Sequence, residues 1–211
     1  MKKTEKTQQQ KTATKSRKRT LTKKTASHEE VSRQDAFTAP PSDRIVYLTG
    51  SVTEELISQV CMAIIHFANM DKTAPITLVI STYGGSVDEM NGLYDVIKHV
   101  KCPVYTVGLG KIMSAGILLL ASGTKGSRLV GANTTLMIHA VASDAGGNIF
   151  DIKREVKLLE KYQSKMTSLL EKETTMSKEK IEEIMNLGHD FYFTAEEAVQ
   201  FGLADAIIGE K

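Results

Sequence analysis

From Arg44 onward, short β-rich runs alternate with segments of helical periodicity, and this alternation limits the fold more than any other feature of the chain. The order is β-α-β-α-β-α-β-β, and strands separated by a helix join a parallel sheet through right-handed crossovers. We therefore predict an α/β fold with a layered core. The predicted strands are Ile45–Thr49, Ile76–Ser81, Pro103–Gly108, Arg128–Val130 and Thr135–Ile138.

The segments around these strands add detail to the prediction. Ile76–Ser81 is nearly all apolar, as in a strand that is buried on both faces. Thr53 can cap the first helix, and Ser114–Ser122 forms an apolar third helix. Towards the C-terminus, Ser177 caps a short helix, and the spacing of Thr194–Glu197 predicts a capping box at the start of the last one.

A long amphipathic helix is predicted at about residues 149–173, and we call it the handle helix. Its uncharged residues recur at 3-4 spacing along one stripe, and charged residues fill its other faces. Because a complete sheet unit precedes it, the stripe can pack on its own domain or project onto another subunit, and the pattern favours neither. The stripe consists of Ile149, Ile152, Val156, Leu159, Gln163, Met166 and Leu170.

Charge divides the chain into two parts. Residues 1–34 carry 11 Lys and Arg against 3 Asp and Glu, whereas the rest of the chain is acidic, so the overall net charge of +2 describes neither part. The basic segment has too few apolar side chains to form a core. We predict a disordered N-terminal extension over residues 1–43 and a single folded domain over residues 44–211.

Several classes of site and location receive no support from the sequence. The two cysteines, Cys61 and Cys102, are too few for a disulfide framework and are expected to be buried, reduced thiols, which suits a cytoplasmic protein. There is no apolar run of about 18 residues, as a membrane span requires. Metal-ligand spacing and a complete phosphate-binding loop are also missing, so no metal or cofactor is predicted.

Ser114 stands where a predicted strand leads through a turn into an apolar helix. At such a turn the hydroxyl lies at the carboxyl edge of the sheet, and the free N–H groups of the helix N-terminus favour a developing oxyanion. The small residues Ala115 and Gly116 leave room for a substrate carbonyl. A serine at this position is, on its own, more often a simple helix cap.

Three other features could complete a site around this serine. His139 ends an apolar strand, and Asp190 precedes an aromatic run, from which it could hold a histidine in the required tautomer. Gly84 and Gly85 would let the backbone approach a ligand closely. Each feature also has a purely structural explanation, and periodicity does not show that these groups meet.

Taken together, these motifs resemble the proteolytic subunit of the Clp protease, the ClpP-type serine peptidases. The resemblance extends over Arg44–Ile208 and includes the chain order Ser, His, Asp. It is carried by DRIVYLTGSV, ISTYGGSV, SAGILLLASGTKGSR, TLMIHAV and HDFYFTAEEAVQFGLADAII. The implied fold is the ClpP/crotonase-like superhelical core of layered β-α-β units, with the handle helix projecting to join two rings.

The resemblance also implies an activity. The chain would be a serine endopeptidase that cleaves unfolded proteins or peptides without a cofactor, inside stacked heptameric rings, in the cytoplasm and in partnership with an AAA+ unfoldase. Its site residues would be Ser114 as nucleophile, His139 as general base, Asp190 as the partner of His139, the backbone N–H groups of Gly84 and Ala115 as oxyanion hole, and Gly85 as support for the turn.

The chain departs from the family at several positions. Tyr83 and Val141 stand where the family usually has proline, and Ala115 stands where it has methionine, so the shape of the substrate groove is affected. Thr77 and Val79 occupy positions at which family members carry aromatic side chains that help to dock the unfoldase.

Other functions remain open at this stage. The basic extension and the altered docking strand would suit a Clp-like protease with a dedicated substrate, as in virus capsid maturation. A crotonase-type acyl-CoA enzyme would share the glycine-based oxyanion site without needing all three triad residues. A non-catalytic ring subunit and nucleic-acid binding through the basic extension are further alternatives, and the acidic body counts against extended nucleic-acid contact.

Overall fold

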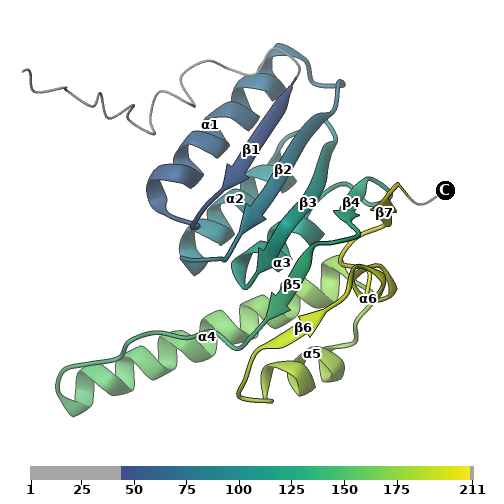
Figure 1. Cartoon of the computed structure of the whole chain (residues 1–211). Coiled ribbons are helices and arrows are strands. Elements are labelled where there is room, and N and C mark those ends of the chain that lie inside the picture. Colours follow the sequence, from purple (N-terminus) through teal and green to yellow (C-terminus); the bar gives the residue numbers. More distant parts are fainter. Residues whose placement is uncertain (1–43, 210–211) are drawn as a thin grey trace, which may run out of the picture.

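The predicted alternation of strands and helices is present in the computed structural model, which describes residues 44–209 (Figure 1). The predictions for the basic extension, residues 1–43, lie outside the described residues. The elements are β1 (Ile45–Thr49), α1 (Glu54–Met70), β2 (Ile76–Thr82), α2 (Val87–His99), β3 (Val104–Met113), α3 (Ala115–Ala121), β4 (Arg128–Gly131), β5 (Thr135–Ile138), α4 (Ile149–Glu173), α5 (Lys178–Met185), β6 (Phe191–Phe193), α6 (Ala195–Gln200) and β7 (Ala206–Ile208).

The strands form one sheet in which β1, β2, β3, β4 and β7 follow one another, each parallel to its neighbour. β5 lies beside the C-terminal part of β3 and is also parallel to it, and β6 runs antiparallel to β5. Parallel neighbours need a crossover connection, and α1 and α2 provide it between β1, β2 and β3. The α/β prediction is therefore confirmed.

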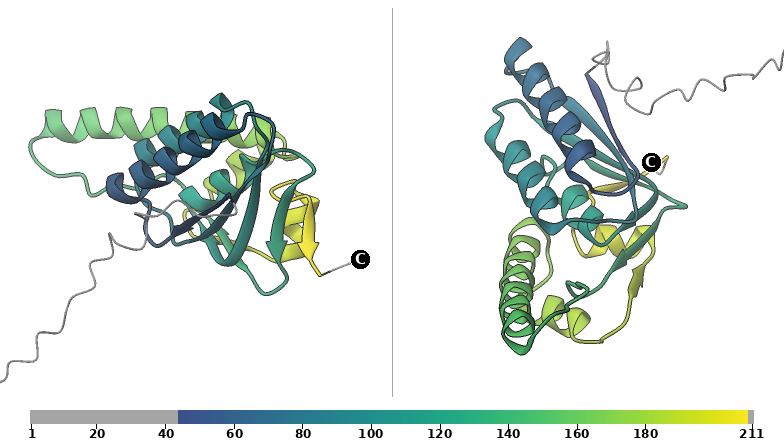
Figure 2. Two further views of the ribbon diagram at one scale, coloured as in Figure 1. Left: turned by 90° about the horizontal axis from the view of Figure 1, so that it is seen from above. Right: turned by 90° about the vertical axis from the view of Figure 1, so that its left-hand side faces the viewer.

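Helices α1, α2 and α3 lie on one face of the sheet (Figure 2). The side chains of β2 consequently alternate between buried and half-buried along the strand, and Thr77, Val79 and Ser81 are on the more open face. The prediction that Ile76–Ser81 is buried on both faces is wrong. An apolar run shows that a strand is central, but only the placement of the helices decides whether its second face is covered.

β3 is longer than predicted and pairs with two different strands. The sequence indicated a turn from Gly108 to the following helix, whereas the strand continues to Met113. Its first half, at Thr106–Gly108, faces β4, and its second half, at Lys111–Met113, faces β5. Gly110, with φ of 71°, lies between the halves and allows the strand to bend. Local turn chemistry could not reveal this extension, because the partner strand comes much later in the chain.

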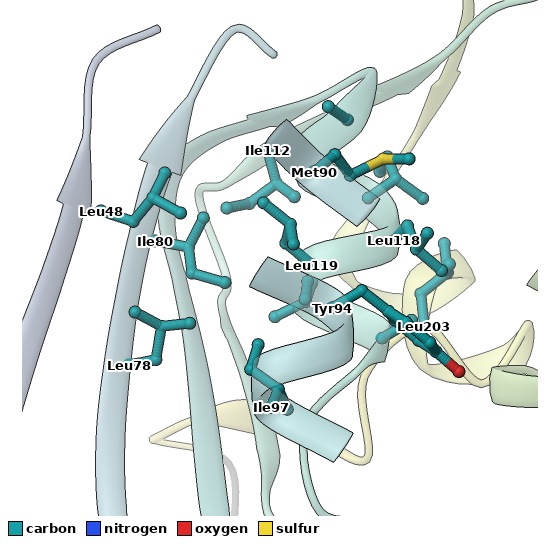
Figure 3. Close-up of a cluster of buried hydrophobic side chains, with 14 of the residues drawn as sticks. Leu48, Leu78, Ile80, Met90, Tyr94, Ile97, Ile112, Leu118, Leu119 and Leu203 are labelled. Carbon is teal, nitrogen blue, oxygen red and sulfur yellow. The ribbon is translucent and has the colours of Figure 1, made fainter. Parts of the chain in front are cut away.

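The core lies between the sheet and the helices, and α3 is at its centre (Figure 3). All residues of α3 are buried, which explains its uniformly apolar sequence. Burial of one leucine or isoleucine side chain contributes about 1.5–3 kcal/mol, so α3 is firmly held. The fully buried side chains of this core include Leu118 and Leu119 of α3 and, from other elements, Leu48, Leu78, Ile80 and Leu93.

The handle helix α4 divides into two halves. Asn148 and Asp151 form a capping box at its start. In its C-terminal half, the stripe residues Met166 and Leu170 are buried in the core, whereas Ile149 is 58% and Val156 46% exposed. The N-terminal half extends away from the rest of the molecule in Figure 1. The stripe therefore packs on its own domain in its C-terminal half and projects in its N-terminal half, and its contact with another subunit stays a prediction. None of the helices in residues 44–209 could span a membrane.

A buried arginine joins the ends of several elements. Arg128, 4% exposed, donates through Nη1 to the carbonyls of Ala121, Glu173 and Gly202 at 3.3, 2.8 and 2.8 Å. Its Nε and Nη2 donate to the Asp205 carboxylate at 2.9 and 2.5 Å. The guanidinium of Arg128 therefore connects β4 with the last residues of α3 and α4 and with Gly202 and Asp205, which lie between α6 and β7. Such bidentate, charge-assisted bonds are strong and geometrically specific.

We predict that Asp205→Asn lowers the free energy of unfolding by about 2–3 kcal/mol near neutral pH, because it leaves the buried Arg128 guanidinium without its counter-charge. Burial alone would raise the pKa of Asp205, but the hydrogen bonds from Arg128 outweigh it and hold the pKa below its ordinary value of 3.8. The carboxylate therefore stabilises the wild type in full above the unfolded-state pKa, and this contribution is lost as pH falls through the lower folded-state value.

Urea unfolding followed by circular dichroism at several pH values checks this prediction. The stability gap between wild type and variant should be constant above about pH 5 and should narrow below about pH 4. Glu182→Gln is the control, because its ion pair with Lys178 is exposed and contributes at most about 1 kcal/mol. A gap that stays the same into strong acid would contradict the assignment.

Candidate active site

Ser114 occupies a strained turn between β3 and α3. Its φ of 52° and ψ of −118° are uncommon for any residue other than glycine. Its N–H donates to the carbonyl of Met137 at 2.8 Å, and its own carbonyl accepts from Ile117 at 3.0 Å. The side chain makes no capping hydrogen bond to the helix. The alternative that Ser114 is a simple helix cap is therefore wrong, and the hydroxyl is available for chemistry.

His139 is the hydrogen-bond partner of this hydroxyl. The His139 Nε2 and Ser114 Oγ atoms are 2.9 Å apart. The contact follows from the sheet: Lys111–Met113 of β3 pair in parallel with Thr135–Met137 of β5, so the residues beyond both strands emerge at the same edge. A nucleophile and a base within 2.6–3.2 Å of each other meet the geometric requirement for activation of a hydroxyl.

Asp190 lies close by in the sheet register but is not bonded to the imidazole. β6 pairs with β5 so that Phe191 faces Ile138, and one further step of this register sets Asp190 opposite His139. The carboxylate is exposed, and its one hydrogen bond among residues 44–209 comes from the hydroxyl of Tyr192 at 3.5 Å. The structure thus brings Ser114 and His139 into contact and leaves Asp190 next to them.

The two glycines after β2 approach the Ser114 turn. A Cβ atom on Gly84 would lie 2.7 Å from the Cβ of Ser114 and 3.0 Å from the carbonyl oxygen of Met113. A Cβ on Gly85 would lie 2.4 Å from the carbonyl oxygen of Val52. Both glycines also have positive φ. Only glycine permits this close approach of two backbone segments.

The N–H groups of these glycines differ in availability. The N–H of Gly84 donates to Thr82 Oγ1 at 2.9 Å, so in this conformation it is not free to bind an oxyanion. The N–H groups of Gly85 and Ala115 make no hydrogen bond to any of residues 44–209. The resemblance implies Gly84 as the donor and Gly85 as support for the turn, whereas in this conformation it is the N–H of Gly85 that has no partner within residues 44–209.

A cavity of about 240 Å³ opens beside the Ser114–His139 pair. Its walls come from the glycine loop, from α2, from the residues that follow His139 and from α4. It includes several residues that sequence reasoning did not assign to a site, among them Met90 and Met166. The lining residues are Tyr83, Gly85, Val87, Met90, Ser114, Ala115, His139, Val141, Ala142 and Met166.

Residues 44–209 offer little support for a reactive cysteine or a metal site. Burial, together with the nearby Glu89, raises the pKa of the Cys61 thiol to about 11, so this cysteine is protonated at neutral pH and unreactive. Cys61 is only partly buried, contrary to the expectation, whereas Cys102 is buried as expected. Residues 44–209 contain no group of three His, Cys, Asp or Glu side chains placed to hold a metal ion.

Comparisons with known proteins lead to one family. The family model described as Clp protease matches residues 6–211. The chain is 32% identical over 174 residues to the ATP-dependent Clp protease proteolytic subunit 2 of Corynebacterium glutamicum, which covers 82% of this chain and 86% of that protein. It is 30% identical over 190 residues to the subunit of the same name from Treponema pallidum, which covers 90% of this chain and 94% of that protein.

We predict that Gly84→Ala lowers the rate at which a fluorophosphonate modifies Ser114 by about a hundredfold, because the new Cβ displaces the serine by a distance large enough to break its alignment with His139. Gly92→Ala is the matched control, since a Cβ at Gly92 meets no atom within 4 Å. Mass spectrometry of the intact protein measures both rates. Equal rates for the two variants would show that the close approach of Gly84 is unimportant.

Proposed function

Because the chain belongs to the Clp protease family and is a serine-type peptidase, we propose that it is an endopeptidase that cleaves peptides and unfolded proteins through an acyl-enzyme on Ser114. One observation carries the proposal. Ser114 has a strained backbone, makes no capping bond, and lies with Oγ 2.9 Å from Nε2 of His139. A serine that served packing alone would not need this conformation.

In the proposed reaction, Nε2 of His139 accepts the proton of Ser114 as the hydroxyl oxygen attacks a peptide carbonyl. The tetrahedral intermediate then collapses: the C–N bond breaks, and the imidazolium gives its proton to the leaving amine. Water, deprotonated by the same imidazole, attacks the acyl-enzyme. The second tetrahedral intermediate that forms then collapses: the bond between the acyl carbon and Ser114 Oγ breaks, and the imidazolium returns its proton to Oγ. The carboxyl product leaves, and the serine hydroxyl is restored.

We assign the oxyanion hole to the N–H groups of Gly85 and Ala115. Neither is bonded within residues 44–209, and both residues line the cavity beside the Ser114 hydroxyl. Gly84 supports the turn, with its own N–H held by Thr82. Donors fixed before the reaction stabilise the developing negative charge without reorganisation, and removal of one such donor typically costs about 3–4 kcal/mol of transition-state stabilisation.

Asp190 is proposed as the residue that orients His139. The β5–β6 register supports this role, since it sets the two residues opposite each other. The carboxylate must turn from Tyr192 towards Nδ1 of the imidazole to fulfil it. A carboxylate there keeps Nε2 free to accept the serine proton and stabilises the imidazolium that forms.

The cavity supports a preference for apolar substrate side chains. Its apolar lining comes from α2, from α4 and from the segment after His139: Val87, Met90, Met166, Val141 and Ala142. Apolar walls with a few convergent polar groups are typical of sites that bind an extended apolar side chain. The acyl-CoA enzyme and the non-catalytic subunit are not favoured, because neither accounts for the Ser114–His139 pair.

The exposed half of α4 supports assembly with further copies of this chain. Ile149, Phe150 and Val156 are between 46% and 68% exposed on it, which is unusual for large apolar side chains on one projecting helix. A chamber formed by such copies would limit access to peptides and unfolded chains.

The two relatives are named ATP-dependent. On the open face of β2, this chain has Thr77 and Val79 where family members carry the aromatic side chains that help to dock the unfoldase. The proposal therefore includes no AAA+ partner.

We predict that Ser114→Ala reduces hydrolysis of a short fluorogenic peptide by at least about a thousandfold and abolishes labelling by a fluorophosphonate, because it removes the nucleophile. Ser168→Ala, on the surface of α4, should keep both at the wild-type level. Peptide assays and gel fluorescence provide the measurements. Labelling that persists in Ser114→Ala would exclude Ser114 as the nucleophile.

We also predict that Val156→Asp shifts the protein towards smaller species at micromolar concentration, because it introduces a charge into the exposed apolar stripe of α4. Lys157→Asp, a charge change on the polar side of the same helix, should leave the mass unchanged. Multi-angle light scattering measures the masses. The assembly proposal fails if the wild type is a monomer or if both variants behave like it.

A further inference from the structure

The residues that follow His139 have little support of their own. Residues 139–146 form no helix or strand, yet Val141 and Ala142 are part of the cavity wall. Among residues 44–209, one hydrogen bond holds the backbone of residues 140–147. It comes from the handle helix: the N–H of Val141 donates to Oε1 of Gln163 at 2.8 Å. We propose, on the basis of the proposed function, that Gln163 is a positioning residue. It would keep His139 within hydrogen-bond distance of Ser114 and hold the cavity wall at Val141 in place.

Gln163 is the polar exception in the apolar stripe of α4. Nε2 of its side chain is buried and has no hydrogen-bond partner within residues 44–209. An unsatisfied buried amide is destabilising, so a methionine or leucine, like the neighbouring stripe residues Leu159 and Met166, would serve packing better. The acceptor oxygen is what an apolar residue could not supply.

The contact completes the restraint on His139 from both sides. On the N-terminal side, Ile138 is paired with Phe191, and Met137 accepts a hydrogen bond from the N–H of Ser114. On the C-terminal side, the anchor is Val141, two residues beyond the imidazole. Without it, the nearest hydrogen bond on this side would be the exposed one from Ser143 Oγ to Glu155, four residues beyond His139. The distance of 2.9 Å between Nε2 and the serine hydroxyl would then vary more.

The same helix turn also shapes the cavity. Met166 lies one turn after Gln163 on the same face of α4 and lines the cavity together with Val141. Gln163 therefore fixes the spacing between the wall that α4 supplies and the wall that follows His139. Its role is distinct from that of Tyr162, whose hydroxyl donates to Asp88 at 2.7 Å and attaches α4 to α2.

Three variants separate positioning from packing. Gln163→Met keeps the size and removes the acceptor, Gln163→Glu keeps an acceptor oxygen, and Tyr162→Phe removes a neighbouring hydrogen bond of the same helix. We expect Gln163→Met to lower kcat for a short fluorogenic peptide and the rate of fluorophosphonate labelling by about tenfold, with a smaller rise in KM and no fall in the melting temperature. Gln163→Glu should recover most of kcat, and Tyr162→Phe should keep it.

The inference is overturned if Gln163→Met retains the wild-type kcat and labelling rate, or if Gln163→Glu is no better than Gln163→Met. Should Gln163→Met fail to fold, hydrogen exchange of the full wild-type chain decides the question: the amide of Val141 should exchange more slowly than those of Ala140 and Ala142, and equal exchange overturns the inference. A wild type without Ser114-dependent hydrolysis would instead refute the proposed function.

Discussion

The site depends on the pairing of β3 with two strands. Its first half joins β4 in the main sheet, and its second half, beyond Gly110, turns to β5. Only this second pairing brings the residues after both strands, Ser114 and His139, to one edge of the sheet. The distance of 2.9 Å between their side chains is therefore a consequence of strand register, which backbone hydrogen bonds define far more tightly than side-chain packing alone could.

The rest of the fold keeps this edge rigid. The strained conformation of Ser114 persists because α3, which starts at the next residue, is buried along its whole length and cannot relax without losing core contacts. The backbone of Gly84 approaches the same turn so closely that an added Cβ would lie 2.7 Å from the Cβ of Ser114. At the far end of α3, Arg128 bonds the carbonyl of Ala121 and so joins this helix to the ends of α4 and α6.

The handle helix links this rigid site to the outer surface. Its C-terminal half is part of the core, where Glu173 is buried and accepts hydrogen bonds from Tyr94 and Lys98. Its N-terminal half exposes apolar side chains, as expected of a surface that another chain covers. Between the halves, Gln163 bonds the segment that follows His139. A displacement of α4 would therefore act first on the segment that follows His139, which α4 bonds at Val141 and, through Glu155, at Ser143.

Much of the architecture could be predicted because it depends on sequence patterns of residues that are close in the chain. The 3-4 spacing in α4, the capping box at Thr194 and the strand at Ile45–Thr49 depend on residues that are close in the chain, and all three are present. Ser114 and His139 could be singled out as candidates at a helix start and a strand end, where parallel sheets place reactive groups. Only the family resemblance joined them into one site.

What the sequence alone determined, then, is the order of elements and the choice of Ser114 and His139 as candidate residues. The tertiary structure decided how they meet: the extension of β3 towards β5, the open second face of β2, the free N–H of Gly85 where Gly84 had been expected, and the contact from Gln163. The physical reason is the same in each case. These features depend on partners far away in the chain, and residue pattern reports on neighbours within a few positions, not on which distant backbone will supply a hydrogen bond.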